Sequence, residues 1–233
     1  MPPNAEPLDP VGILGGTTLF AALGDSELES VAARCLRRTY GKGQYLCYQG
    51  DPGDRLFIVG RGLVKVVLVS DQGGEMVLIT LGTHEMFGEL AVLDQGPRSA
   101  SVVAVVPTTV LMLTRPVLLE LMGTHAAVRD ALLTSLGALV RRLTEQAGDL
   151  VFLDLGARLA KLLLRLAEDS GQTGDRIVVE LGLTQSDLAG MIGASRPAVN
   201  RVLQTLVARG LVEISGHSIV LRDLLGLRRR AGV

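Results

Sequence analysis

The sequence predicts an α+β protein in which an N-terminal β jelly-roll is followed by a long central helix and a C-terminal winged helix-turn-helix domain. Between Tyr40 and Leu113, short runs of Val, Ile and Leu alternate with glycine-containing turns, as in a roll of antiparallel strands. Between Ala126 and Asp154, leucines recur at heptad spacing, which is typical of a long helix with a narrow apolar face. From Thr184 to Leu206, a capping motif, a turn glycine and an amphipathic segment indicate two short crossing helices.

The composition is that of a packed globular protein. The 233 residues are 48% hydrophobic and 20% charged, and the apolar runs are shorter than the roughly 20 residues needed to cross a membrane. Residues 1–17 have the proline and polar content of a flexible N-terminal tail rather than of a secretory signal. We therefore expect a cytoplasmic protein without a membrane partner.

Cysteine and histidine usage gives no support for a metal site. Cys35 and Cys47 are too few for a thiolate cluster and are expected to be buried, reduced thiols. His84, His125 and His217 lie far apart in the sequence and are expected in loops or at the surface. We expect no metal.

The first folded domain is predicted over residues 18–125. Residues 18–37 have helical spacing of apolar side chains, and the strands follow. Strands are expected at Leu56–Val59 and Leu63–Val69, and Asp71–Gly74 is expected to be the tip of a hairpin that ends near Leu81. A second sheet must cover one face of these strands, which favours a roll.

The central helix is predicted over residues 126–154. Its heptad seam consists of Leu132, Leu136, Leu139, Leu143, Gln146, Leu150 and Leu153. Such a stripe favours a parallel homodimer, in which the polar Gln146 would help to fix the register. The alternative is a long helix that lies on its own β-domain.

The C-terminal domain is predicted over residues 155–233. It is expected to contain a helix at Ala157–Ala167, a polar loop at 168–175, a strand at Ile177–Leu181, two helices, and a wing formed by Leu211–Ile214 and Ser218–Leu221. From Thr184 to Val233 there are seven arginines against Asp187, Glu213 and Asp223, a local net charge of 7 − 3 = +4. This local excess indicates an acidic partner such as nucleic acid, although the whole chain carries a net charge of −1.

The helix-turn-helix is predicted in detail. Thr184 and Asp187 form a capping box, Gly193 makes the turn, and Ser195 is expected to cap the second helix. With Val199, Val202, Leu203 and Leu206 facing inward, the outward residues are Arg196, Pro197, Asn200, Arg201 and Gln204. Arginine in the first turns of such a helix can donate two hydrogen bonds to guanine in the major groove of double-stranded DNA. The alternative is an ordinary solvated helical face.

The segment from Phe87 to Ala100 offers partners for a nucleotide. Gly88 allows close approach of a phosphate to the backbone, Arg98 can pair with the phosphate, Ser99 can add a hydroxyl, and Glu89 can accept a ribose hydroxyl hydrogen. An ordinary surface Glu–Arg pair would have the same spacing. No Ser/His/Asp, Cys/His or metal-ligand grouping accompanies the segment, so we expect no enzymatic activity.

With these motifs the chain resembles the cyclic-AMP receptor protein family, within the wider group that includes the fumarate-nitrate-reduction regulators. The resemblance covers most of the length: Gly50-Asp51, Gly62-Leu63-Val64-Lys65-Val66, Phe-Gly-Glu-Leu to Arg-Ser-Ala, Phe152-Leu153-Asp154, and Ser195-Arg196 to Arg201-Val202-Leu203. It implies a homodimeric transcription regulator that binds a near-palindromic DNA site, is controlled by 3′,5′-cyclic AMP and contacts RNA polymerase. It also implies a nucleotide site formed by Gly88, Glu89, Leu90, Arg98, Ser99, Leu143 and Thr144.

The sequence departs from the family pattern at two positions. Family members that respond to cyclic AMP usually have two adjacent hydroxyl or amide side chains for the adenine, where this chain has Leu143-Thr144. Many also have a glutamate that reads cytosine, where this chain has Pro197. The alternatives are therefore a regulator of the same fold that binds DNA without an effector and one that responds to a different small molecule. The sequence lacks the cysteine cluster of iron–sulfur sensors. His84 or Cys47 could be considered as a haem ligand, but neither lies in a recognisable haem-binding motif.

Overall fold

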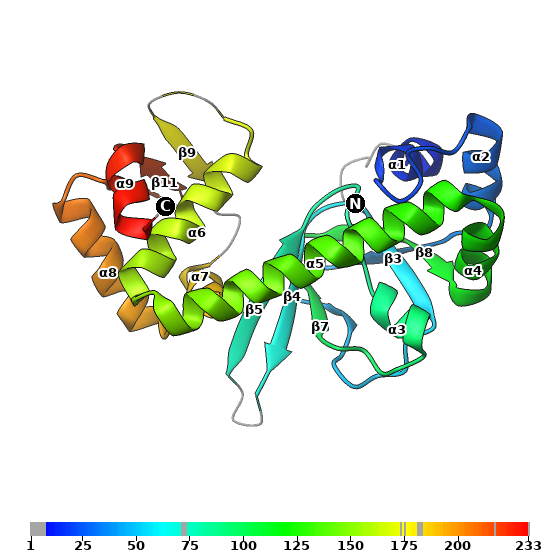
Figure 1. The fold of residues 1–233 in the computed structure, drawn as a ribbon, viewed down its shortest axis with the longest axis horizontal. Coiled ribbons are helices and arrows are strands. Elements are labelled where there is room, and N and C mark those ends of the chain that lie inside the picture. Colours follow the sequence, from blue (N-terminus) through cyan, green and yellow to red (C-terminus); the bar gives the residue numbers. More distant parts are fainter. Residues whose placement is uncertain are drawn as a thin grey trace. The chain divides into compact units, whose positions relative to one another are not determined.

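The computed structural model describes residues 8–70, 74–172, 174, 176–180, 184–216 and 218–232. By its packing contacts the chain divides into a first unit, Met1–Gly74 with Ile79–Val140, and a second unit, Glu75–Leu78 with Arg141–Val233. Helices and strands are labelled in Figure 1.

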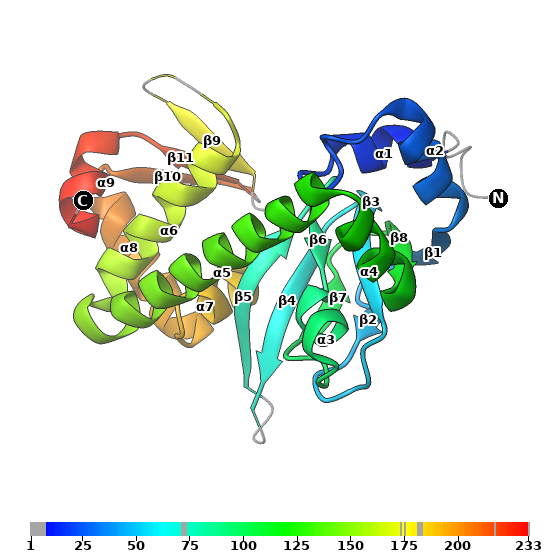
Figure 2. The same cartoon turned by 45° about the vertical axis from the view of Figure 1, so that its right-hand side comes forward.

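The predicted β roll lies in the first unit, apart from residues 75–78, which belong to the second unit. One sheet has the strand order β1-β8-β3-β6 and another has the order β2-β7-β4-β5 (Figure 2). The strands are β1 (Leu36–Tyr40), β2 (Tyr45–Cys47), β3 (Arg55–Arg61), β4 (Val64–Val69), β5 (Glu75–Leu81), β6 (Met86–Phe87), β7 (Ser101–Ala104) and β8 (Thr108–Thr114). The strands expected at Leu56–Val59 and Leu63–Val69 are β3 and β4.

The hairpin expected after β4 is also present at its described ends. The Ser70 amide donates to the Gly74 carbonyl over 2.9 Å, and β4 and β5 are neighbours in their sheet. Its predicted tip at Asp71–Gly73 lies outside the described residues.

Alternate residues of β3 enter two hydrophobic cores. Leu56 and Ile58 pack in a core shared with the helices, whereas Phe57 and Val59 pack between the sheets. Side chains of a strand alternate between its faces, so a run of five consecutive buried positions in β3 requires cover on both sides. This double cover fixes the strand from which the next loop leaves.

Helices cover the outer face of this sheet. They are α1 (Pro10–Gly16), α2 (Asp25–Ala33), α4 (Arg115–Thr124) and the first turns of α5 (Ala126–Phe152), with the short α3 (Glu89–Asp94) after β6. The long helix predicted at 126–154 is α5. Its Val128 and Leu132 are almost completely buried in the helical core.

The start of the chain differs from the expected tail. Pro10–Gly16 form α1, in which Leu14 is fully buried, and the Asp9 carboxylate accepts the Val11 amide hydrogen over 3.1 Å. Proline is well suited to the first turn of a helix because its missing amide would have no helical partner there. Pro10 therefore marks the start of a helix and not a flexible tail. Residues 1–7 lie outside the described residues.

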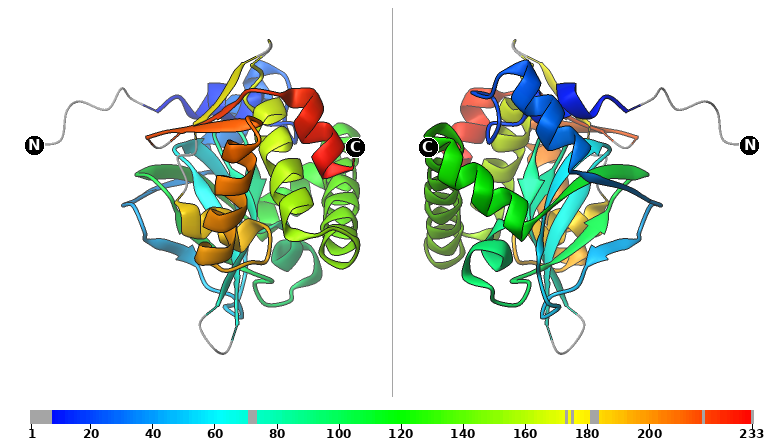
Figure 3. Two further views of the ribbon diagram at one scale, coloured as in Figure 1. Left: turned by 90° about the vertical axis from the view of Figure 1, so that its left-hand side faces the viewer. Right: turned by 90° about the vertical axis from the view of Figure 1, so that its right-hand side faces the viewer.

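The second unit has its own core. Its elements are α6 (Leu155–Asp169), β9 (Ile177–Glu180), α7 (Gln185–Met191), α8 (Arg196–Ala208), β10 (Val212–Ser215), β11 (Ser218–Leu221) and α9 (Leu224–Ala231). The left view of Figure 3 shows α6 between α8 and α9, and all three helices bury leucines in this core.

The predicted wing is an antiparallel pair of β10 and β11, and β9 pairs with the other edge of β11. Leu181, the last residue expected in β9, lies outside the described residues. Helix α6 begins two residues before the expected Ala157 because Asp154 caps it, its carboxylate accepting the Ala157 amide hydrogen over 2.8 Å.

Candidate functional site

The Arg98 side chain is held by two backbone carbonyls. Nη1 donates to the Gly88 carbonyl over 2.9 Å, and Nη2 donates to the Arg55 carbonyl over 2.8 Å. The guanidinium carbon lies 5.2 Å from the centre of the Phe57 ring, a cation–π distance, and the residue is only 6% exposed. The loop after β6 and the strand β3 therefore fix a buried positive charge in one orientation.

The third nitrogen of this guanidinium, Nε, is buried and has no hydrogen-bond partner in the part of the chain that the structure describes. A Cβ at Gly53 would lie 2.9 Å from Nε, and a Cβ at Gly88 would overlap Nη1. These two glycines allow the backbone to pack closely around the guanidinium. A buried charged donor without a partner is costly, so an anionic acceptor that reached Nε would be strongly favoured.

Of the other predicted residues of this segment, Gly88 contacts Arg98 directly and Glu89 is affected by its charge. Gly88 has a φ of 86°, a left-handed conformation that favours glycine, and Glu89 follows it at the start of α3. Burial raises the pKa of the Glu89 carboxyl, partly opposed by its own amide and by the Arg98 charge. Ser99 is exposed, and Leu90 is 37% exposed.

The loop at Gly50–Gly53 belongs to the same site, although the sequence marked it only as a turn. The Gly50 amide donates to the Arg98 carbonyl over 2.9 Å, and the Arg98 amide donates to the Asp51 carbonyl over 2.8 Å. This loop therefore holds the Arg98 backbone, while Gly53 lets the loop pack closely against the Arg98 side chain. A glycine directly after Asp51-Pro52 was the available signal, but nothing local in the sequence pairs that turn with a segment 45 residues later.

Part of helix α5 carries an exposed apolar face. Leu133 is 59% exposed, Val140 62%, Leu143 40% and Leu150 43%. Together with Leu136 and Ala147 they form a stripe at steps of three and four residues, which we call the α5 stripe. Isolated exposed leucines are common, but a continuous row along a helix marks a surface for another helix.

The predicted seam only partly coincides with the α5 stripe. Leu136, Leu143 and Leu150 belong to both, but Leu132 is 1% exposed and packs in the helical core of its own unit. Gln146 donates from Nε2 to the Leu78 carbonyl over 2.9 Å, so it has a partner within its own unit. Leu139 and Leu153 are half-buried. The heptad pattern alone does not fix the register, because leucines at neighbouring positions satisfy either of two parallel rows.

Thr144 is exposed on α5 beside Leu143. The predicted adenine-contacting pair is therefore on the accessible part of the helix, with Leu143 also in the α5 stripe.

Helix α7 begins with the predicted capping box. The Asp187 amide donates to Thr184 Oγ1 over 3.2 Å, and the Thr184 amide donates to Asp187 Oδ2 over 2.8 Å. Gly193 makes the turn to α8 with a φ of 61°. Ser195 has the backbone conformation of a helix cap, but its side chain makes no capping hydrogen bond. The predicted side-chain cap of α8 is therefore wrong.

Helix α8 divides into an inner and an outer face as predicted. Val199, Leu203 and Leu206 are almost completely buried. The outward residues Arg196, Pro197, Arg201 and Gln204 are exposed, and Asn200 is half-buried. Figure 3 shows α8 at the surface of its unit, where its outer face can meet a partner.

No metal site is found among the described residues, where no group of three or more His, Cys, Asp or Glu side chains is close enough to hold an ion. Cys35 and Cys47 are free thiols, and burial raises the pKa of Cys35 to about 11. His84 Nδ1 lies 3.0 Å from the Ile13 carbonyl, and His125 Nε2 lies 2.8 Å from Glu27 Oε1. His217 lies outside the described residues. No described helix is long and apolar enough to span a membrane.

Comparison with known proteins agrees with this geometry. Residues 37–125 match the cyclic nucleotide-binding domain, and residues 157–230 match the Crp-like helix-turn-helix domain. The chain is 32% identical to the CRP-like cAMP-activated global transcriptional regulator of Mycobacterium tuberculosis over 94% of this chain and 98% of that protein. It is 32% identical to the cyclic AMP receptor protein of Thermus thermophilus over 89% of this chain and 94% of that protein.

Solved structures show the same fold. The Thermus thermophilus catabolite activator protein, 32% identical, matches with a TM-score of 0.54 over 93% of this chain and 99% of that one. The global regulator CLP of Xanthomonas campestris, 24% identical, matches with a TM-score of 0.75 over 86% of this chain and 100% of that one.

The chain belongs to the CRP/FNR family of transcription regulators. It combines a cyclic nucleotide-binding β roll, a long central helix and a C-terminal helix-turn-helix domain, and proteins of this family are DNA-binding factors without enzymatic activity.

Proposed function

We propose that this protein is a homodimeric transcription regulator whose binding to DNA is controlled by 3′,5′-cyclic AMP in the β roll. The observation that carries the proposal is the buried Arg98 Nε, which has no hydrogen-bond partner among the described residues and lies close to the Gly53 backbone. The relatives in Mycobacterium tuberculosis and Thermus thermophilus, named as a cAMP-activated regulator and a cyclic AMP receptor protein, support the choice of effector.

The residues around Arg98 fit a cyclic nucleotide. Its Nε would donate to an oxygen of the cyclic phosphate, and the exposed Ser99 hydroxyl would add a second donor. The backbone at Gly88 and Leu90 would lie beside the phosphate, because Gly88 adds no side chain there. Glu89, in its charged form, would accept the ribose 2′-hydroxyl hydrogen.

Fewer residues are available to bind the adenine base than to bind the phosphate and the ribose. Thr144 would contact the adenine, whereas Leu143 can only pack against it or against a partner helix. A missing hydrogen bond to the adenine amine weakens selectivity by roughly 1–3 kcal/mol if the donor stays unpaired. Calorimetric titration with cyclic AMP and, separately, cyclic GMP tests the effector, and binding of cyclic AMP is the expected result. If neither nucleotide gives a heat of binding, control by a cyclic nucleotide is contradicted. That result would favour a regulator that binds DNA constitutively or responds to another small molecule.

The dimer would form through α5. The α5 stripe, centred on Val140 and Leu143, would be covered by the same face of a second chain in a parallel coiled coil. This register differs from the seam predicted from the sequence, in which Leu132 was included.

The DNA surface would be the outer face of α8. Arg196 and Arg201 are placed for bases or phosphates of the major groove, and Thr184, Ser195, Asn200 and Gln204 would add polar contacts. Pro197 supplies neither charge nor donor, so the half-site read by family members with glutamate here does not carry over. Two recognition helices related by the dimer axis would bind half-sites about one DNA turn apart on a near-palindromic site.

Selection of duplexes from a random-sequence pool, with cyclic AMP present, would define the DNA site. Arg201→Ala should then weaken binding to the selected duplex by about 1–3 kcal/mol, and unchanged affinity would contradict its assignment. We also propose that the DNA-bound protein contacts RNA polymerase through residues 168–175, the first two of which end α6. A pull-down of polymerase with the DNA-bound protein tests this contact.

A further inference from the structure

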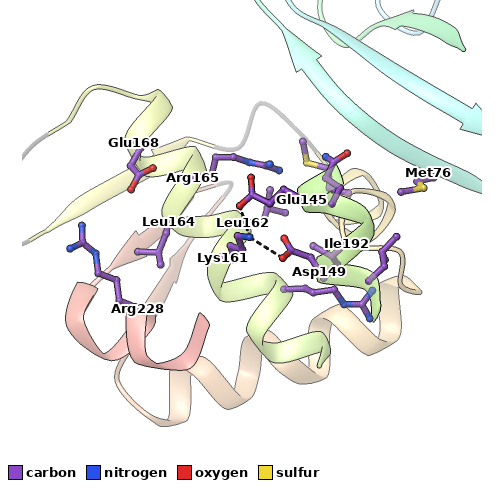
Figure 4. Close-up of a pocket in the computed structure, with 14 residues that line it drawn as sticks. Met76, Glu145, Asp149, Lys161, Leu162, Leu164, Arg165, Glu168, Ile192 and Arg228 are labelled. Carbon is purple, nitrogen blue, oxygen red and sulfur yellow. Dashed lines mark hydrogen bonds and ion pairs between the residues drawn. The ribbon is translucent and has the colours of Figure 1, made fainter. Parts of the chain in front are cut away.

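The corner between α5 and α6 is spanned by an ion-pair cluster. Lys161 of α6 reaches back to α5, where Nζ lies 2.6 Å from Glu145 Oε1 and 2.8 Å from Asp149 Oδ1. Figure 4 shows Lys161 between these carboxylates. The Lys161 and Asp149 side chains are only 24% and 25% exposed. Water therefore screens this pair less than an ordinary surface ion pair.

A second ion pair ties the C-terminal helix to the same corner. Arg230 Nη2, near the end of α9, lies 2.6 Å from Asp154 Oδ1. The same carboxylate oxygen accepts the Ala157 amide hydrogen over 2.8 Å and so caps α6. Asp154 is one of the two residues between α5 and α6, so Arg230 holds the turn itself.

Gly156 lies directly beside this contact. It is buried in the first turn of α6, and a Cβ built on it would overlap Arg230 Nη2 and lie 2.7 Å from Cζ. Glycine weakens a helix relative to alanine, and an alanine here would have to displace the end of the Arg230 side chain from its place beside Asp154. The neighbouring Arg229 is different: its side chain is 75% exposed, and its Asp223 partner is 3.9 Å away.

We infer that Arg230 and Lys161 are positioning residues that clamp the α5–α6 corner, so that the last turns of α5 move with the DNA-binding domain as one block. The packing contacts agree with this, because the last turns of α5, from Arg141 onward, belong to the same compact unit as α6 and α9. An effector that alters α5 would then act on the DNA-binding domain through a rigid corner. This last step rests on the proposed function.

The clamp itself is tested without any ligand. Arg230→Gln removes the charge, and Asp154→Asn also removes the ion pair while keeping a side chain that caps helices well. Amide hydrogen exchange at residues 153–157 should accelerate by about two- to fivefold in each variant, and the double variant should add little. Arg230→Lys should retain most of the protection. Arg229→Gln, which removes the same charge one residue earlier, should leave the exchange unchanged.

The effect on regulation is measured separately, as the ratio of the DNA dissociation constants without and with cyclic AMP. We expect this ratio to fall about two- to fivefold in Arg230→Gln and Lys161→Gln and to stay unchanged in Arg229→Gln. Unchanged hydrogen exchange in Arg230→Gln would overturn the clamp. Faster exchange with an unaltered ratio would overturn the positioning role. If the wild-type protein does not respond to cyclic AMP, the proposed function fails, while the exchange experiment still decides the clamp.

Discussion

Replacement of Arg98 by lysine separates the charge of this residue from the geometry of its guanidinium. Lysine keeps the positive charge but lacks the planar fork that donates to the Gly88 and Arg55 carbonyls at 2.9 and 2.8 Å. Its ammonium has no equivalent of Nε, a buried donor that has no partner among the residues the structure describes. Arg98→Lys therefore removes the proposed phosphate donor and disturbs the contacts that orient it.

The size of the effect follows from these contacts. A hydrogen bond to a charged group contributes about 1.5–3 kcal/mol, so loss of the phosphate contact should weaken cyclic AMP binding by about 2 kcal/mol, or roughly 30-fold. Loss of one carbonyl contact should destabilise the roll by a similar amount, which corresponds to a fall in Tm of about 4–8 °C.

Calorimetric titration measures the binding, and Arg115→Lys is the matched control. Arg115 also donates from Nε to a backbone carbonyl, that of Val92, over 2.7 Å, and it is partly buried in the same unit. The control should lose stability but bind cyclic AMP with nearly wild-type affinity. Full affinity in Arg98→Lys, or equal losses of affinity in both variants, would refute the assignment of Arg98 to the phosphate.

Three further predictions concern the ribose, the dimer and the base. Because burial raises the pKa of Glu89, the carboxylate that accepts the ribose hydroxyl hydrogen is lost as the pH falls through that raised pKa. Affinity for cyclic AMP should therefore begin to decline at a higher pH than an ordinary glutamate would give. If the affinity of Glu89→Gln fell with pH in the same way, Glu89 would not be the group responsible. The same shift means that Glu89 stabilises the fold below its unfolded pKa and that this contribution is lost as the pH rises through the folded pKa. Val140→Glu should dissociate the dimer in sedimentation velocity, whereas Leu132→Ala should cost about 2–5 kcal/mol of stability without altering the dimer interface directly; a Val140→Glu dimer would exclude the α5 stripe. Leu143→Thr should raise the preference for cyclic AMP over cyclic GMP by about fivefold or more in competition titration, and an unchanged preference would remove residue 143 from the base site.

The sequence predicts the elements of this fold well where a local pattern has one structural solution. The Thr184–Asp187 capping box, the turn at Gly193 and the inner face of α8 follow from short-range hydrogen bonding and helical spacing, and the structure has all of them. The paired strands β10 and β11 are equally local.

The parts that could not be predicted depend on contacts between distant segments. The role of Gly53 becomes visible only when its loop meets Arg98, and the carbonyl of Arg55 carries no sequence signal at all. Leu132 looked like a seam residue because spacing does not reveal which of two adjacent leucine rows packs inward. Helix α1 could not be predicted either, because a helix of seven residues is stabilised by the packing of Leu14 rather than by the helix propensity of its residues.

The affinity of the wild-type protein for its selected DNA duplex, measured by fluorescence anisotropy without and with saturating cyclic AMP, tests the regulatory mechanism most directly. An effector that favours the DNA-competent arrangement should increase the affinity about 5- to 150-fold, and Arg98→Lys should require much more cyclic AMP for the same increase. An identical affinity with and without cyclic AMP would contradict control by this nucleotide.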